Sequence, residues 1–212
     1  MEHLMIPDGY YAPLTIRETE VAIKEIKDHF ERALAKSLHL TRVSAPLFVK
    51  PESGLNDNLN GVERPVSFGI KEQNDAEVEI VHSLAKWKRI KLAQMNVSPG
   101  RGIYTDMNAL RPDEELDNIH SIYVDQWDWE KVIDRDQRSL AYLKKVVRRI
   151  YEAIKVTENK LYVEFPQIEP MLPEDIFFIH SEQLLQQYPN MTPKERENAI
   201  VKKHKAVFII GI

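Results

Sequence analysis

A tryptophan and four basic residues are grouped in one predicted helix, at 83–95: Lys86, Trp87, Lys88, Arg89 and Lys91. At helical spacing Lys88 shares a face with Leu84 and Trp87, which should pack inward. An amino group on such a face could point into a cleft and bind a carboxylate or a phosphate. The alternative is a solvated basic face without a binding role. A nucleic-acid role is a weaker interpretation, because the whole chain is acidic.

Arg111 stands at the end of a predicted strand, directly before the polar turn Pro112-Asp113-Glu114-Glu115. A guanidinium held rigidly on a strand can make two parallel hydrogen bonds to a phosphate or a carboxylate. The alternative is a salt bridge from Arg111 to Asp113 or Glu114 that closes the end of a hairpin. The residues by themselves leave both interpretations open.

The predicted return strand, at 120–128, ends in polar residues on both of its faces. Alternation along the strand places Gln126 and Asp128 on one face, together with Ile122 and Val124. The amide of Gln126 could orient an ammonium group, and the carboxylate of Asp128 could pair with its charge. The alternative is that both residues lie on the exposed rim of an ordinary strand.

Three histidines, His82, His120 and His180, each lie at an end of a predicted strand and precede a serine. A histidine beside a serine in the sequence does not provide the geometry of a catalytic triad, so capping or polar packing is favoured for all three. The chain also lacks the short signatures of P-loop proteins, dinucleotide-binding proteins, α/β-hydrolases and zinc metalloproteases. The common nucleotide and hydrolase motifs are therefore absent.

Composition and charge set limits on the class of protein. The 212 residues are enough for one large domain or two small ones with a sizeable core. The absence of cysteine excludes disulfides, thiol catalysis and Cys-ligated metal sites, and it suits a reducing compartment. The net charge of −4 does not favour nucleic acid or an anionic membrane surface, and no stretch approaches the length of a membrane span. We therefore expect a cytoplasmic protein with no nucleic-acid and no membrane partner.

The hydrophobic pattern predicts alternating helices and short strands. The helices are expected at 16–37, 84–95, 136–164, 181–187 and 193–203, and the strands at 40–49, 66–70, 78–81, 103–104, 110–111, 120–128, 176–179 and 206–212. Thr15 and Thr192 begin capping boxes, and His82-Ser83 should cap the second helix. Pro46 should place its strand at an edge, a bulge or an interface. A buried terminal carboxylate would be costly, so we expect the chain to continue past residue 212.

Several long blocks of sequence, taken in order, resemble the ammonia-dependent (A-type) asparagine synthetases, or aspartate–ammonia ligases. The blocks are HSLAKWKR at 82–89, YTDM at 104–107, ALRPDE at 109–114 and the stretch at 120–130. DNLNG at 57–61 and VFIIG at 207–211 extend the resemblance. The resemblance runs from about residue 16 to residue 212.

The resemblance implies a fold similar to the catalytic core of class II aminoacyl-tRNA synthetases, especially the aspartyl enzyme. This is an α+β fold with an antiparallel sheet flanked by helices, here a single catalytic domain at 1–212 that is incomplete at its C-terminus. The helix and strand at 16–49 match the first class II motif, which implies a homodimer through this segment. Arg111, Asp113 and Glu114 match the second motif, whose arginine binds the α-phosphate of ATP and whose acidic residue lies near the adenine.

The resemblance also implies which residues bind aspartate. Asp57, Ser83, Lys88, Gln126 and Asp128 fall where the aspartate pocket of the family is expected. Lys88 is implied on a substrate carboxylate, with Gln126 and Asp128 near the α-amino group. Lys88 and Arg111 are therefore the expected catalytic residues, while the metal ligands stay unassigned.

The implied reaction joins L-aspartate and ammonia at the expense of ATP. Aspartate and ATP, with Mg²⁺ on the phosphates, give a β-aspartyl-adenylate and pyrophosphate, and ammonia then releases asparagine and AMP. Members of the family continue well beyond Gly211, so we expect adenylation by the 212-residue chain alone to be absent or badly impaired. The alternatives are a non-catalytic, synthetase-like amino-acid-binding or partner module, and a core similar to aspartyl-tRNA synthetase.

Overall fold

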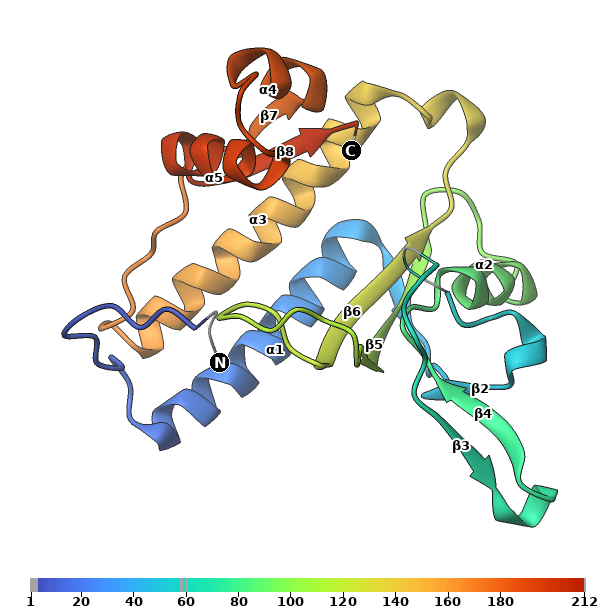
Figure 1. Ribbon diagram of the computed structural model, residues 1–212. Helices are drawn as coiled ribbons and strands as arrows, with labels where there is room; N and C mark the ends of the chain where they lie inside the picture. The colour runs from blue at the N-terminus through green and yellow to red at the C-terminus, as the bar shows by residue number, and fades with distance from the viewer. Residues whose placement is uncertain (1–3, 58, 60, 212) are drawn as a thin grey trace. The chain divides into compact units, whose positions relative to one another are not determined.

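The structure is a computed structural model that describes residues 4–57, 59 and 61–211 (Figure 1). Helices and short strands alternate along the chain, as the sequence predicts. The described residues form two compact units. The first draws on Met1–Ala12 and Leu38–Gln137, and the second on Pro13–Ser37 and Arg138–Ile212. The single domain expected at 1–212 stays a prediction.

One sheet of the first unit has the strand order β1-β5-β6. Its strands are β1 (Leu40–Arg42), β5 (Gly102–Leu110) and β6 (Tyr123–Lys131). β5 and β6 pair antiparallel over their whole length, from Gly102 opposite Lys131 to Leu110 opposite Tyr123, whereas β1 pairs parallel with the start of β5. Gly102 is required at this close approach, because a Cβ there would lie 2.3 Å from the Glu130 carbonyl oxygen.

The other sheet of the first unit is antiparallel and has the order β2-β4-β3. Its strands are β2 (Phe48–Val49), β3 (Ser67–Ile70) and β4 (Ala76–Ile80), and a short 3-10 helix, η1 (Pro51–Ser53), follows β2. A second 3-10 helix, η2 (Lys71–Gln73), leads from β3 to Asn74 and Asp75, which both have a φ of 55°. Asn and Asp tolerate this left-handed conformation better than most residues. The strands predicted at 66–70 and 78–81 thus pair as an antiparallel hairpin.

Helix α2 (Ala85–Gln94) packs against β5 and β6 in the first unit. Just before its start, Leu84 packs in a buried cluster with Val49 and Met107. Near its end, Leu92 packs in a second cluster with Ile103. Because both ends of α2 are anchored in the core, the residues between them are held in a defined position against the sheet.

The predicted strand at 40–49 is wrong as a single element. It divides into β1 and β2, which lie in different sheets, and Pro46 lies in the irregular segment between them. Proline lacks the N–H that a continuous ladder needs, so the chain leaves one sheet before it and joins the other after it. Both strands lie at an edge of their sheet among the described residues, in agreement with the expectation from Pro46.

Three other elements differ from the prediction by more than two residues. β5 is one continuous strand where two short ones were predicted, and β6 begins at Tyr123 rather than at residue 120. Helix α3 (Leu140–Glu164) begins four residues late, after the 3-10 helix η3 (Arg135–Gln137). Ser139 sets its start, because its side chain accepts a hydrogen bond of 3.3 Å from the Tyr142 N–H.

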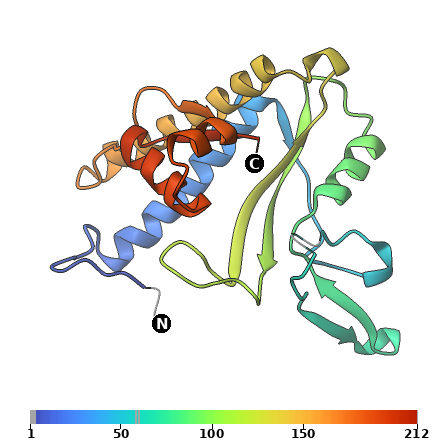
Figure 2. The same cartoon turned by 45° about the horizontal axis from the view of Figure 1, so that its top comes forward.

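The second unit contains α1 (Ile16–Leu38), α3, and a pair of parallel strands with two helices between them. These later elements are β7 (Phe177–His180), α4 (Ser181–Gln187), α5 (Pro193–His204) and β8 (Val207–Ile210) (Figures 1 and 2). Ile179, Leu184 and Ile200 form their buried core. The predicted capping boxes at Thr15 and Thr192 are confirmed by reciprocal hydrogen bonds with Glu18 and Glu195.

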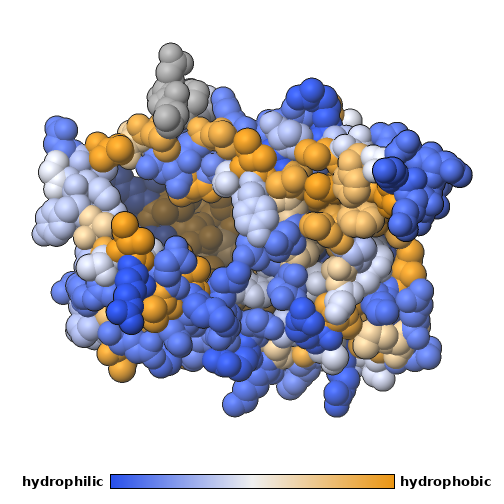
Figure 3. Space-filling view, turned by 90° about the horizontal axis from the view of Figure 1, so that it is seen from below, coloured by the Kyte–Doolittle hydropathy of each residue, from blue (hydrophilic) through white to orange (hydrophobic). Residues whose placement is uncertain are grey.

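The surface is mixed in polarity. Figure 3 shows one face, on which hydrophobic patches interrupt a mainly hydrophilic surface. Helix α1 leaves Ile16, Val21 and Ile23 exposed. Within the part of the chain that the structure describes, no helix combines the length and the apolar character that crossing a membrane requires.

Candidate active site

Lys88 is buried inside the first unit, with only 1% of the residue exposed. It lies on the inward face of α2, one turn from the buried Leu84 and Leu92, and its ammonium group forms an ion pair with Oδ1 of Asp128 on β6. A lysine is almost never fully buried unless it is paired. The solvated-face alternative is therefore wrong for Lys88, whereas Lys86 and Arg89 on the same helix are exposed.

Asp128 has a second carboxylate oxygen that is not used by the fold. Oδ2 is buried and accepts no hydrogen bond from the described residues. Gln126 lies half-buried two positions earlier on β6, on the face that alternation predicts for both residues. The structure thus places an available carboxylate oxygen, a buried ammonium group and an amide on one side of the sheet.

Asp57 and Ser83 meet at the N-terminal end of α2. The Asp57 N–H donates to the Ser83 carbonyl oxygen at 3.3 Å, and the Asp57 carboxylate accepts from the Lys86 N–H at 3.4 Å. The predicted cap by His82-Ser83 is wrong, because Leu84 occupies the N-cap position without a side-chain hydrogen bond. A carboxylate from a distant loop occupies the helix N-terminus instead, where the helix dipole favours negative charge.

Arg111 follows β5 directly and continues its ladder through an N–H bond of 2.8 Å to the Ile122 carbonyl oxygen. Its Nη1 lies 3.8 Å from Oε2 of Glu114, so the hairpin-end salt bridge is present with Glu114. The same alternative is wrong for Asp113, which pairs with Arg64 instead. Nε of Arg111 is buried and has no hydrogen-bond partner among the described residues.

Arg64 is a residue that the sequence reasoning missed. Its Nη2 donates to Oδ1 of Asp113 at 2.5 Å, and its backbone N–H donates to Oδ2 at 2.8 Å. These hydrogen bonds hold the pKa of the Asp113 carboxyl below its usual value. Arg64 lies 49 positions from Asp113, between the strands predicted at 40–49 and 66–70, and no local pattern marks the pairing.

His82 is fully buried, with none of its surface exposed. Its backbone N–H donates to Oδ1 of Asn56 at 2.8 Å, but neither ring nitrogen has a hydrogen-bond partner within the described ranges. By contrast, Nδ1 of His120 lies 2.8 Å from the Asp117 carboxylate on the surface. Capping and satisfied polar packing therefore both fail to describe the His82 ring.

The unpartnered buried groups all lie in the first unit. In the part of the chain that the structure describes, every buried side-chain nitrogen or oxygen without a hydrogen bond belongs to His82, Arg111 or Asp128. Each such atom costs about 1–3 kcal/mol if it stays unpaired. All three residues lie in the first unit, beside the predicted site residues. Buried groups of this kind are expected where a polar, charged ligand binds.

The predicted residues form three contacting pairs: Lys88 with Asp128, Asp57 with Ser83, and Arg111 with Glu114. No hydrogen bond or ion pair among the described residues joins one of these pairs to another. Asn58 and Asn60, in the DNLNG block, lie outside the described residues. Nor do any three His, Asp or Glu side chains of the described chain come together to hold a metal ion.

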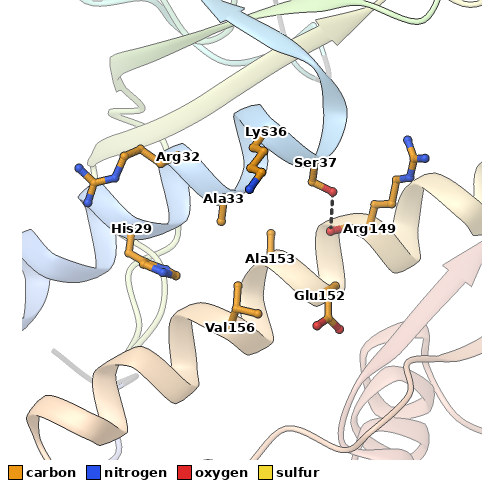
Figure 4. A pocket seen from close by; sticks show the side chains of 9 residues that line it. All are labelled: His29, Arg32, Ala33, Lys36, Ser37, Arg149, Glu152, Ala153 and Val156. Carbon is orange, nitrogen blue, oxygen red and sulfur yellow. Dashed lines mark hydrogen bonds between the residues drawn. The ribbon is translucent and has the colours of Figure 1, made fainter.

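A separate pocket of about 420 Å³ lies in the second unit, between α1 and α3 (Figure 4). Ala33, Ala153 and Val156 line its middle, while the side chains of Arg32 and Arg149 extend away from the gap. The pocket contains none of the predicted site residues. Its polar groups are not gathered on one point, so it is a poor candidate for catalysis.

Comparison with known proteins identifies the family. The family model described as "Aspartate-ammonia ligase" matches residues 17–212. The chain belongs to this family. Over its full length it is 61% identical to an aspartate–ammonia ligase of Clostridium perfringens and 58% identical to one of Parabacteroides distasonis. It spans 63% and 61% of the length of these two relatives.

Solved structures confirm the fold. The chain is similar to Entamoeba histolytica asparaginyl-tRNA synthetase in complex with asparaginyl-adenylate, with a TM-score of 0.62 and 10% identity over 92% of this chain and 44% of that one. The asparaginyl-tRNA synthetase of Pyrococcus horikoshii complexed with asparaginyl-adenylate gives a TM-score of 0.59, over 89% of this chain and 44% of that one. The predicted α+β fold of the class II synthetase type is confirmed.

Proposed function

We propose that the protein is an ATP-dependent ligase that makes L-asparagine from L-aspartate and ammonia. The observation that carries this proposal is the buried Lys88–Asp128 pair with its free carboxylate oxygen. The pair occurs in a chain that belongs to the aspartate–ammonia ligase family. In this proposal, the β-carboxylate of aspartate attacks the α-phosphorus of ATP and pyrophosphate leaves. Ammonia then attacks the acyl carbon, AMP leaves and the new amide loses a proton.

The aspartate pocket is assigned to the Lys88 side of the site. The positive charge of the buried Lys88 ammonium group stabilises a substrate carboxylate. Because the group is already desolvated and in place, no reorganisation is needed at the moment of reaction. The free oxygen of Asp128 accepts a hydrogen bond from the substrate α-ammonium group. The Gln126 amide orients the same ammonium group. Asp57 and Ser83, held together at the start of α2, complete the pocket.

The nucleotide is assigned to the Arg111 side. The Arg111 guanidinium neutralises the charge that develops on the α-phosphoryl group, and its free Nε provides a donor that the fold leaves unused. Glu114 limits the position of the guanidinium through their ion pair. Asp113, held by Arg64, and Glu114 form the acidic part of the ATP site.

The metal and the assembly are further parts of the proposal. Mg²⁺ on the ATP phosphates is implied by the resemblance, but the described residues offer no cluster of three metal-binding side chains, and no step above depends on one. We place the homodimer interface at 16–49, where α1 exposes Ile16, Val21 and Ile23. The proposed location is the cytoplasm, with no nucleic-acid partner.

The test is AMP formation from ATP and aspartate, with and without ammonium, by the purified protein at its natural length and with its mass verified. Ammonium-dependent AMP and asparagine are the expected products. Aspartate binding without pyrophosphate release would instead support a non-catalytic module. Transfer of aspartate to tRNA would support a synthetase core, and either result would overturn the proposal.

A further inference from the structure

His82 is held rigidly at the end of β4, two residues after Ile80. Oδ1 of Asn56 accepts from the His82 backbone N–H at 2.8 Å, and Nδ2 of Asn56 donates to the Ile80 carbonyl oxygen at 3.4 Å and to Glu79 at 3.2 Å. Asn56 is itself buried, with 7% exposed. Hydrogen bonds of the Asn56 side chain therefore anchor the backbone that carries the His82 ring.

The His82 ring, unlike the His82 backbone, makes no hydrogen bond to the described residues. Both ring nitrogens are buried and have no hydrogen-bond partner among the described residues. An imidazole always carries at least one N–H donor, and its neutral form also carries one acceptor. Unpaired polar groups in the interior destabilise the fold, and packing alone does not offset this cost. A bound ligand is the simplest source of hydrogen bonds for these ring nitrogens.

Neighbouring residues place His82 between the two halves of the proposed site. Ser83 follows it directly and contacts Asp57 on the aspartate side. Leu84 packs against Ala109, two residues before Arg111, so the loop lies against the end of β5.

We propose that His82 is a further ligand-binding residue of this site, where its ring donates a hydrogen bond to the oxygens at which the aspartate β-carboxylate meets the ATP α-phosphate. This inference rests on the proposed function, because that function supplies the two anionic groups. An imidazole N–H suits an anionic oxygen, and a hydrogen bond to a charged group is stronger than a neutral one. His82 would thus orient the attacking carboxylate toward phosphorus.

The test compares His82→Leu with His82→Gln at the natural length of the protein. Leucine has a similar volume but no polar atom, so the ligand-free protein should melt at the same temperature or higher, because an unpaired polar group is removed. Binding of aspartate in the presence of a non-hydrolysable ATP analogue should weaken by about tenfold or more, as for loss of a hydrogen bond to a charged group. The His82→Gln variant, whose side chain offers a donor and an acceptor, should bind aspartate more tightly than the His82→Leu variant.

His29→Leu is the matched control in the second unit. Nδ1 of His29 lies 3.0 Å from Oγ1 of Thr157, so this ring has a partner within the fold. The control should lower the melting temperature of the ligand-free protein and leave ligand binding unchanged.

Two outcomes would overturn the inference, and they are distinguishable. If His82→Leu lowers the ligand-free melting temperature while binding stays at the wild-type level, His82 is structural and the proposed function stands. If the wild-type protein neither binds aspartate nor forms AMP, the proposed function fails, and the ligand assigned to His82 fails with it.

Discussion

The two units differ in whether some of their buried polar side chains lack a hydrogen-bond partner. In the second unit, the buried Thr157 donates from Oγ1 to the Ala153 carbonyl oxygen at 2.8 Å, and the Tyr151 hydroxyl donates to Pro173 at 2.6 Å. In the first unit, His82, Arg111 and Asp128 keep buried atoms without a partner among the described residues. Satisfied groups stabilise the fold at all times, whereas unsatisfied ones gain their partners only from a ligand.

This contrast predicts a difference in local stability between the two units. In the second unit, loss of a helix cap or of a buried hydrogen bond should lower stability without affecting function. The first unit accepts a less stable ligand-free state in exchange for preorganised groups that need no rearrangement when substrate binds. Substitutions of the site residues in the first unit should therefore change binding and turnover more than stability, and substitutions of partnered polar groups in the second unit should do the reverse.

The largest effect is expected from Lys88→Ala. Loss of the ammonium group should lower aspartate-dependent turnover by about 100-fold or more, as for loss of a preorganised charge-stabilising group. The fold should survive, with a loss of stability below the about 3–5 kcal/mol typical of a broken buried ion pair, because Asp128 keeps 23% of its side chain exposed. Steady-state kinetics and urea unfolding measure the two effects.

Arg89→Ala is the control for Lys88→Ala. Arg89 lies on the same helix but is 72% exposed, and its nearest carboxylate, that of Glu130, lies 3.9 Å away. The control should change stability by less than about 1 kcal/mol and leave turnover intact. Full activity in Lys88→Ala would show that the aspartate pocket is wrongly assigned.

A smaller and more selective effect is expected from Arg111→Ala. The ATP-dependent step should slow by about 10–100-fold, because one donor to the developing phosphoryl charge is lost. Aspartate binding should change little, since no hydrogen bond or ion pair among the described residues joins Arg111 to Lys88 or Asp128. Aspartate-dependent exchange of pyrophosphate into ATP isolates this step. An equal loss in aspartate affinity would place Arg111 in the aspartate pocket.

Thr192→Ala tests the other side of the comparison. It removes both side-chain hydrogen bonds of Thr192 in the capping box at the start of α5. The expected result is a loss of about 1 kcal/mol in the free energy of unfolding, with aspartate and ATP binding unchanged. Urea unfolding and a binding titration measure the two quantities. Weakened binding would contradict the division of roles between the two units.

The smallest effect concerns pH and the Arg64–Asp113 pair. The Arg64 hydrogen bonds lower the pKa of Asp113 in the folded protein, so their contribution to stability is complete above the unfolded value and is lost as the pH falls through the folded one. Arg64→Ala should raise the Asp113 pKa toward its ordinary value of 3.8. NMR titration of the carboxyl carbon measures this change. An unchanged pKa would show that another group holds Asp113.

Part of the site was predictable because its signal is local. The inward direction of Lys88 follows from helical spacing, and the shared face of Gln126 and Asp128 follows from strand alternation. Arg64 and Asn56 left no such signal, because their partners Asp113 and His82 lie 49 and 26 positions away. His82 was misjudged for a related reason: whether a ring nitrogen has a partner depends on every element around it.

By itself, the sequence determined the helices, most strands, the capping boxes and the family, because these depend on neighbouring residues or on ordered blocks of residue types. Only the tertiary structure decided that the chain divides at Pro46 between two sheets, that Asp57 reaches the start of α2, and that Asp113 pairs with Arg64. These outcomes depend on which distant groups meet once the backbone has folded. No local pattern of residues encodes such meetings, because hydrogen bonds and burial are properties of the whole packed unit.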